Sequence, residues 1–260
     1  IANTLSPGDH VLVLATGRFA FGWGEIAQHL GVNITTLDFG KSKGIDLEAV
    51  EEVLTSEGSE KFKAILVAHT DTSTSIKTNL RQLRDCIDTT QHPALLFADC
   101  IASLGTDCFK MDEWGVDLMI SACQKGLMTP PGLSFVWFNE KAEQARLQKQ
   151  IVSSYWDWLP RTNVKRYYQY FCGTAPTHHI YGLRTALDMM IKENNLESIW
   201  QKHLNLSSAI WAAFECWSEF GNIELNIKEQ SLRSNAVTAA SISKGGAKKL
   251  QDWCEKNSDL

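Results

Sequence analysis

The chain lacks the long apolar run that a membrane-spanning helix requires. Such a helix needs about 18 or more consecutive apolar residues, and no run in these 260 residues approaches that length. A basic run or stripe is also lacking, because the 25 lysine and arginine residues are interspersed with 30 acidic ones. These absences argue against a membrane and against nucleic acid as partners.

The cysteines lack the pattern of a disulfide framework or a zinc site. There are seven of them, at positions 86, 100, 108, 123, 172, 216 and 254, and no two form a C-x-x-C pair. An odd number without such pairs favours reduced thiols in a cytosol-like compartment. We therefore expect a cytoplasmic protein. The chain opens on Ile1, as if in the middle of an element, so organellar targeting by an upstream segment is kept as an alternative.

What the chain does contain is a regular alternation of short apolar runs and helical patterns, and its apolar share of 44% is enough for a sizeable core. Strands are predicted at residues 10–15, 34–39, 64–68, 94–98, 116–120 and 133–138, and helices at 25–30, 46–54, 79–89 and 140–152. This alternation is typical of βαβ units, and continuous apolar strands indicate a sheet that is covered on both faces. We therefore predict that residues 1–193 form an α/β domain with a mostly parallel sheet.

The rest of the chain has a different character. Residues 153–172 are rich in aromatic side chains without a clean period, and we interpret them as a connection that covers something. After it we predict helices at 177–192 and 196–220, strands at 223–227 and 236–242, and a last helix at 246–256. We expect residues 194–260 to be the start of a smaller α+β domain.

Two of the predicted strands end in opposite charges. Asp99 closes the run at 94–98, and Lys125 follows the run at 116–120, just before a rigid Pro-Pro-Gly turn. In open α/β sheets, ligands bind at the edge formed by the carboxyl ends of the strands. Pyridoxal phosphate (PLP) chemistry needs a lysine that binds the cofactor aldehyde and an acid that keeps the pyridine nitrogen protonated. A lone lysine after a strand would be an ordinary surface side chain, so the prediction rests on the combination.

Five motifs are specific in combination. Residues 121–132 read S-A-C-Q-K-G-L-M-T-P-P-G, residues 98–105 read A-D-C-I-A-S-L-G, and residues 69–75 read H-T-D-T-S-T-S. They are similar to the patterns S-G-S-Q-K-A-L-x-x-P-P-G, V-D-S-V-A-S-L-G and H-G-E-S-S-T-G, and residues 6–13 and 173–184 match in the same way. The chain thus resembles, over its whole length, the class V aminotransferases of PLP fold type I. The alanine–glyoxylate and serine–glyoxylate (serine–pyruvate) enzymes are the most similar members.

The resemblance implies a role for each matching position. Lys125 would bind the cofactor aldehyde and then act as general acid and base, and Asp99 would pair with the pyridinium nitrogen. Ile101 would pack under the ring. Phe19 would stack on the other face, where relatives usually have tryptophan, although it could instead be a core residue.

Three more positions follow from the resemblance. Gln124 would bind the cofactor phosphate, and Thr72 would contact the region of the ring oxygen. Thr174 would reach the phosphate of the neighbouring subunit, which makes a homodimer part of the implied mechanism. As alternatives, Thr72 could cap the segment after it, and Thr174 could be the N-cap of the helix that starts near residue 177.

Other polar residues receive structural interpretations. We expect His69 to be a packed, hydrogen-bonded imidazole and Cys123, which stands where the family has serine, to be a buried thiol. The adjacent His178 and His179 point to different faces of a helix, which argues against a metal site. Phe171 falls near a position where relatives offer a tyrosine hydroxyl to the phosphate.

The resemblance also implies parts that these residues do not supply. We expect the small-residue turn that holds the phosphate to lie upstream of Ile1, and the arginine that grips the substrate carboxylate to lie downstream of Leu260. Arg233 does not sit in the matching motif. The leading hypothesis is transamination between serine or alanine and glyoxylate or pyruvate. The alternatives are a cysteine desulfurase-like C–S lyase, which usually has a histidine before the lysine, and a truncated non-catalytic relative.

Overall fold

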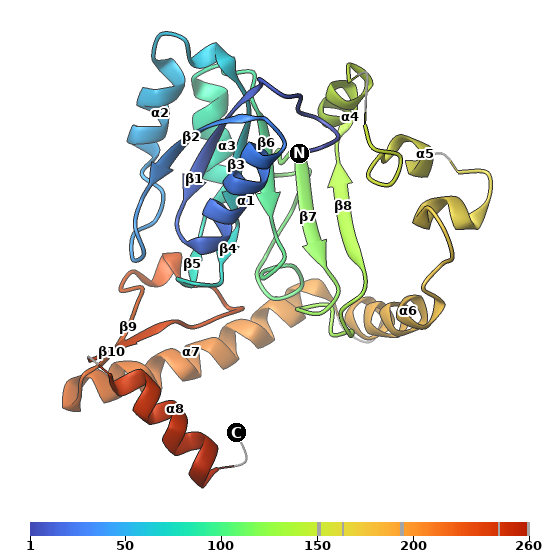
Figure 1. Ribbon diagram of the computed structural model, residues 1–260. Coiled ribbons are helices and arrows are strands. Elements are labelled where there is room, and N and C mark those ends of the chain that lie inside the picture. The colour runs from blue at the N-terminus through green and yellow to red at the C-terminus, as the bar shows by residue number, and fades with distance from the viewer. Residues whose placement is uncertain (150–151, 163, 193–194, 244, 259–260) are drawn as a thin grey trace.

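The computed structural model describes residues 1–149, 152–162, 164–192, 195–243 and 245–258. A six-stranded sheet forms its centre, in the order β2 (Asn33–Asp38), β1 (His10–Ala15), β3 (Phe62–Ala68), β6 (Leu95–Asp99), β7 (Leu118–Ala122) and β8 (Ser134–Phe138) (Figure 1). The first five strands are parallel and β8 is antiparallel to β7. The predicted, mostly parallel sheet is confirmed. Strand β8 reverses because a short loop, too short for a crossover, joins it to β7.

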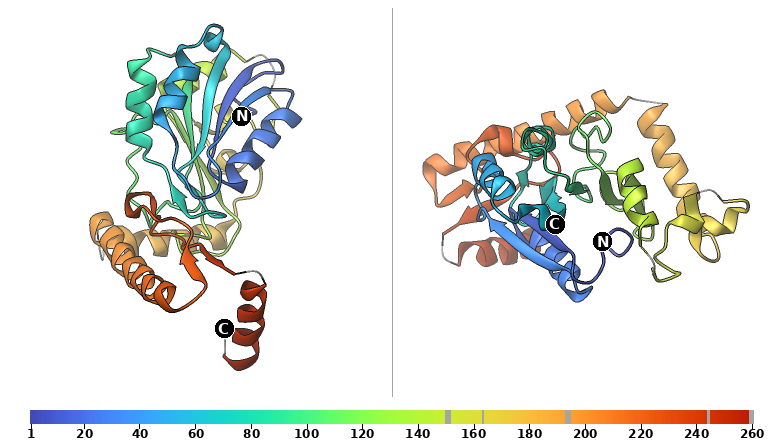
Figure 2. Two further views of the ribbon diagram at one scale, coloured as in Figure 1. Left: turned by 90° about the vertical axis from the view of Figure 1, so that its left-hand side faces the viewer. Right: turned by 90° about the horizontal axis from the view of Figure 1, so that it is seen from above.

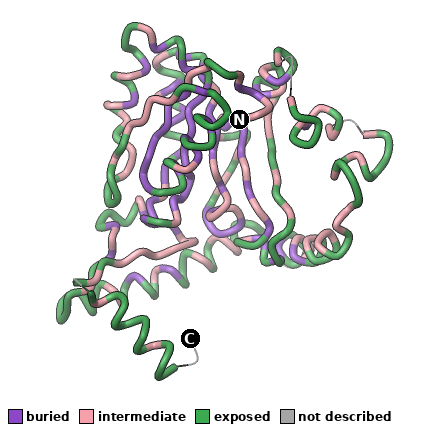
Figure 3. The backbone as a smooth tube through the Cα atoms, in the orientation of Figure 1, coloured by how far each residue is buried: buried purple, intermediate pink, exposed green. Residues whose placement is uncertain are grey.

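Helices cover both faces of the sheet. Helices α1 (Arg18–His29) and α4 (Glu140–Leu147) lie on one face, and α2 (Leu47–Thr55) and α3 (Leu80–Thr89) lie on the other (Figures 1 and 2). The strands in the middle of the sheet are therefore buried on both sides, which explains their unbroken apolar sequence (Figure 3).

Side-chain caps explain where most of these helices begin. Asp46 accepts hydrogen bonds from two backbone amides of α2, and Asn79 and Asn139 each accept one at the start of α3 and α4. The predicted helices at 46–54 and 79–89 are confirmed. Two predicted bounds are wrong: α1 begins seven residues before residue 25, and α4, predicted at 140–152, ends at Leu147. Residues 150–151 of that predicted helix lie outside the described residues.

The remaining elements lie in the connections between the strands and in the chain after α4. They are η1 (Ser59–Lys61), β4 (Thr70–Asp71), β5 (Ile76–Lys77), α5 (Leu159–Thr162), η2 (Tyr167–Phe171), α6 (Thr177–Ile191), α7 (Leu196–Phe220), β9 (Ile223–Leu225), η3 (Gln230–Leu232), β10 (Ala240–Ile242) and α8 (Gly246–Asn257). Helix α7 runs below the carboxyl ends of the strands (Figure 1). The predicted strand 236–242 is shortened to its last three residues. In the part of the chain that the structure describes, no helix is both long and apolar enough to cross a membrane.

Candidate functional site

The carboxyl ends of the central strands meet at one edge of the sheet. In the register of the sheet, Ala68 at the end of β3 pairs with Asp99 at the end of β6, and Asp99 pairs with Ile120 in β7. Two backbone hydrogen bonds continue the pairing beyond the strands, from the amide of His69 to the carbonyl of Asp99 and from Cys100 to Ile120, both 2.9 Å long. The loops that follow these strands therefore start side by side.

Asp99 is a largely buried carboxylate with few partners. Its Oδ1 accepts a hydrogen bond of 2.8 Å from the backbone N–H of Ile101. The pKa of Asp99 is raised from 3.8 to about 6, mainly by burial; the hydrogen bond from Ile101 opposes the increase and the nearby charge of Asp71 adds to it. Among the described residues no cation pairs with this carboxylate. A protonated nitrogen at this point would supply the missing positive charge.

The loop that carries the lysine is closed around Cys123, which is fully buried. The amide of Cys123 donates to the carbonyl of Leu133. The amide and the hydroxyl of Thr129 both donate to the carbonyl of Cys123. The thiol of Cys123 donates to the carbonyl of Pro130 at 3.0 Å, and its sulfur accepts from the amide of Leu133 at 3.3 Å. This confirms that Cys123 is a structural thiol.

Lys125 stands on a tight turn within this loop. The amide of Met128 donates to the carbonyl of Lys125 at 2.9 Å, and Met128 adopts a positive φ of 57°. The next residue, Gly126, presses against the loop after Asp99, because a Cβ at this position would lie 2.2 Å from the carbonyl oxygen of Leu104. The side chain of Lys125 is exposed, and in the described part of the chain it forms no ion pair or hydrogen bond. The lysine loop is thus docked on the loop of Asp99 while its amine stays free.

The hydroxyl-rich loop after β3 is joined to the start of α1 through Asp71, which is fully buried. Its Oδ2 accepts from the amides of Phe19 and Ala20 at 2.9 and 3.1 Å. The prediction of site residues from the sequence missed Asp71. One signal was available, because an acid stands inside a run of hydroxyl residues. The other, a helix start with only Gly17 as a cap, was hidden because the helix was predicted to begin at residue 25.

The seven predicted site residues have the following positions. Asp99, Ile101, Gln124 and Lys125 lie on the two docked loops, Phe19 and Thr72 lie on the segments joined by Asp71, and Thr174 lies on the connection before α6. Phe19 is 49% exposed, so the alternative that it belongs to the core is wrong.

The two capping alternatives are also wrong. Asn79, not Thr72, caps α3, and Thr72 makes no hydrogen bond in the described part of the chain. The N-cap of α6 is Pro176, and no side chain caps that helix, so Thr174 does not act as its cap. Both threonine hydroxyls are therefore without a structural task among the described residues.

The histidines have structural roles. His69 is 2% exposed, its Nδ1 lies 2.8 Å from the hydroxyl of Ser103, and burial lowers its pKa to about 4. The predicted packed, hydrogen-bonded imidazole is confirmed. His179 donates from Nε2 to the carbonyl of Pro131 at 3.0 Å, so α6 supports the lysine loop from outside.

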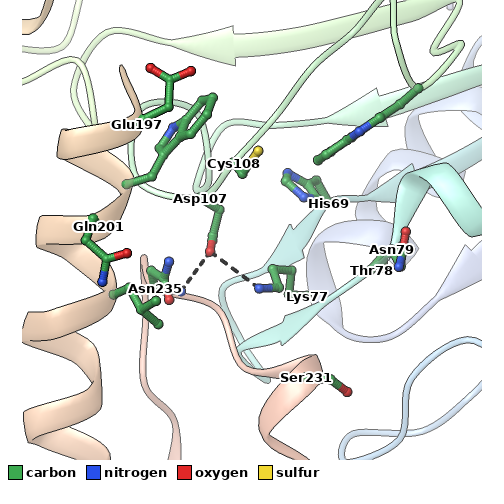
Figure 4. A pocket seen from close by; sticks show the side chains of 13 residues that line it. His69, Lys77, Thr78, Asn79, Asp107, Cys108, Glu197, Gln201, Ser231 and Asn235 are labelled. Atoms are coloured by element: carbon green, nitrogen blue, oxygen red, sulfur yellow. Dashed lines mark hydrogen bonds and ion pairs between the residues drawn. The ribbon is translucent and has the colours of Figure 1, made fainter. Parts of the chain in front are cut away.

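A cavity of about 460 Å³ lies beside these loops, at the contact with α7 and the chain after it (Figure 4). Its floor is Asp107, which is fully buried and accepts from the amide of Asn235 at 2.9 Å and from the hydroxyl of Ser234. Lys77 lies 3.9 Å from the same carboxylate. Neither Asp99 nor Lys125 is among the described residues that line this cavity, so it is separate from the predicted site.

The sequence as a whole matches one known protein family. The profile of Aminotransferase class-V matches residues 1–257. The chain belongs to the class-V aminotransferase family. It is 34% identical over 246 residues to the serine–glyoxylate aminotransferase of Methylorubrum extorquens, an alignment that covers 92% of this chain and 59% of that protein. It is also 32% identical over 247 residues to the L-aspartate–glyoxylate aminotransferase of Paracoccus denitrificans, covering 94% of this chain and 60% of the relative.

The fold agrees with the family. The crystal structure of the alanine–glyoxylate aminotransferase of Nostoc sp. superposes with a TM-score of 0.86 at 26% identity, covering 98% of this chain and 66% of that one. The predicted PLP fold type I is thus confirmed. The class-V chain described here spans about three fifths of the length of the curated relatives.

Membership of the class-V family implies PLP as cofactor, and the residues at the sheet edge fit it. Asp99 is a buried carboxylate without a cation, and Lys125 is an amine without a partner, among the described residues. Thr16, at the end of β1, has a fully buried hydroxyl that finds no hydrogen-bond partner in the described part of the chain. A cofactor with a basic ring nitrogen, an aldehyde and a phosphate has a use for each of these groups.

Proposed function

We propose that the protein is a PLP-dependent aminotransferase that moves an amino group from a small amino acid to a small 2-oxo acid through Lys125. The observation that carries this proposal is the pair of docked loops, one with a buried acid that lacks a cation and the other with a free lysine. The names of the three proteins given above all contain glyoxylate, and the other substrate in them is serine, aspartate or alanine. We therefore take glyoxylate or pyruvate as acceptor and serine or alanine as donor.

Asp99 and Lys125 perform complementary tasks in this proposal. The bound cofactor supplies an electron-withdrawing ring that makes a proton on the substrate Cα acidic. Asp99 holds a proton at the ring nitrogen, which keeps that withdrawal strong. With the cofactor bound, the amine of Lys125 would take the proton from the substrate Cα as a general base and then deliver a proton as a general acid.

The other predicted residues bind and orient the cofactor. We assign Phe19 and Ile101 to the two faces of the ring, Thr72 to the ring oxygen, and Gln124 to the phosphate. The exposed Thr174 contacts the phosphate of a neighbouring subunit, which requires a homodimer. Its free hydroxyl on the connection before α6 supports this assignment.

We also propose that residues 194–260 begin a second domain after the cofactor-binding domain of residues 1–193. Strands β9 and β10 pair with each other in a sheet of their own, apart from the six-stranded sheet, which supports the division. A cytoplasmic location is proposed because all seven cysteines are free thiols.

Two measurements on the full-length protein test the function. The purified protein should show the visible absorption band of lysine-bound PLP, lose it in Lys125→Ala, and keep it in Lys110→Ala, which removes an exposed lysine paired with Glu113. Serine or alanine should bleach the band, and added glyoxylate should restore it with formation of glycine. A protein without any band would be a non-catalytic relative, and sulfide release from cysteine would identify a C–S lyase.

A further inference from the structure

Helix α1 begins without a cap from its own sequence. Its N-cap position is Gly17, which has no side chain, and yet the amides of Phe19 and Ala20 are both satisfied. The acceptor is the carboxylate of Asp71, which lies 52 residues from Phe19 along the chain. An anion at this point is favoured by the unpaired amides and the dipole of the helix. A buried charge thus replaces a local cap.

The contact is built to hold one geometry. A Cβ on Gly17 would lie 2.5 Å from Cγ of Asp71, so only glycine admits the carboxylate at this distance. Ser73 braces the other side: its amide and hydroxyl donate to Oδ1 of Asp71 at 3.0 and 2.6 Å, and its oxygen accepts from the amide of Arg18 at 2.9 Å. The carboxylate therefore has donors on both oxygens, and the contacts from the amides of residues 18–20 join the loop to the helix.

Asp71 stands between residues that belong to the proposed cofactor site. It binds the backbone of Phe19 directly and precedes Thr72 in the chain. Its negative charge acts on Asp99 and raises the pKa of that carboxyl. One buried group thus touches the ring-stacking segment, carries the hydroxyl loop and adds to the charge beside the ring nitrogen.

We propose that Asp71 is a positioning residue of the cofactor site, which fixes the backbone of Phe19 against the ring face and adds negative potential beside Asp99. The inference rests on the proposed function, because a ring must be present for Phe19 to stack on it. Asp71 itself is fully buried and enclosed by Gly17, Ser73 and the start of α1, so it would act on the cofactor through these neighbours.

The test compares Asp71→Asn with Asp46→Asn in the full-length protein. Asp46 makes the same kind of contact, to two amides at the start of α2, but on the far side of the sheet from α1. An asparagine at position 71 has no negative charge. Its NH2 group would replace one carboxylate oxygen and would face N–H or O–H donors, from which it cannot accept a hydrogen bond. We expect the dissociation constant of PLP to rise about tenfold in Asp71→Asn and to stay unchanged in Asp46→Asn.

Two further readouts do not depend on the cofactor. In cofactor-free protein, Asp71→Asn should lower the pKa of Asp99, measured by carbon NMR of its carboxyl, because a neighbouring negative charge is gone. Hydrogen exchange should speed up at Phe19 and Ala20. Looser packing around Asp99 would also lower this pKa by hydrating the carboxyl, so the titration is compared with that of Ser73→Ala, which loosens the contact but keeps the charge of Asp71. If Asp71→Asn does not fold, Ser73→Ala removes only the brace: it should weaken PLP binding and speed up exchange at Phe19 and Ala20 to a smaller extent, and shift the Asp99 titration less than Asp71→Asn because the charge of Asp71 remains.

The outcomes separate the two claims. If the unmodified protein binds no PLP, the proposed function fails, and the Asp99 titration and the hydrogen exchange still decide whether Asp71 links the segments. If the protein binds PLP and Asp71→Asn binds it equally well, with an unchanged Asp99 titration, the role of Asp71 is overturned.

Discussion

The negative charge of Asp99 is disfavoured by burial. We therefore expect ionisation of Asp99 to lower the free energy of unfolding of the cofactor-free protein. Because the folded-state pKa of about 6 lies above the ordinary value of 3.8, the folded form binds more protons than the unfolded form between these values. Stability therefore falls as pH rises through this window. A neutral side chain of the same shape avoids this loss.

We accordingly predict that Asp99→Asn stabilises the cofactor-free protein. The increase in the free energy of unfolding should be absent below about pH 4, develop between about pH 4 and 6, and reach about 2–3 kcal/mol above about pH 6. Urea unfolding of the variant and the unmodified protein at pH 4, 5, 6 and 8 measures it. The difference cancels the opposite contribution of His69, whose lowered pKa favours the folded state as pH rises. A variant that is less stable at pH 8 would contradict this account of Asp99.

At the scale of elements, the lysine loop and the loop after Asp99 are held together by backbone contact. We predict that Gly126→Ala forces them apart, because its Cβ would lie 2.2 Å from the carbonyl of Leu104. The free energy of unfolding should fall by about 1–3 kcal/mol, and PLP binding should weaken with it.

The control for this change is Gly22→Ala. Gly22 lies inside α1, and nothing stands within 4 Å of an added Cβ. Because alanine favours a helix, this variant should gain about 0.5–1 kcal/mol and bind PLP as before. Equal stability of Gly126→Ala and the unmodified protein in a denaturant titration would show that the loops are not tightly docked.

The elements also show what the sequence could predict. Strands β1 and β6 and helices α3 and α7 follow from local signals: apolar runs, helical spacing and a cap beside each helix start. The start of α1 does not, because its cap comes from Asp71 on another loop. In the same way, the strand-end charges predicted Asp99 and Lys125, but the close packing of Gly126 on Leu104 joins residues far apart in the chain.

At the scale of the whole molecule, one buried acid joins the chain after α7 to the sheet edge. Asp107 accepts from the amide of Asn235 (Figure 4). It also accepts from the hydroxyl of Ser234, and the hydroxyl of Thr70 in the hydroxyl loop is within hydrogen-bond distance of both Asp107 and Ser234. The C-terminal segment thus rests against the loop that carries Thr72. Residues that follow α7 are therefore in a position to affect the cofactor site.

We predict that Asp107→Asn lowers the free energy of unfolding by about 2 kcal/mol, because several buried donors lose a charged acceptor. Hydrogen exchange should increase in residues 230–236 and in the hydroxyl loop together. Glu113→Gln breaks an exposed ion pair with Lys110 and should leave both readouts unchanged. Faster exchange in residues 230–236 alone would mean that the two segments move independently.

The central claim is that Lys125 is the lysine that binds PLP. Borohydride reduction fixes a lysine-bound cofactor to the protein permanently, and peptide mass spectrometry then identifies the modified residue. The full-length protein should carry one phosphopyridoxyl group, on the peptide that contains Lys125. A group on another lysine, or no modification after incubation with PLP, would contradict this assignment.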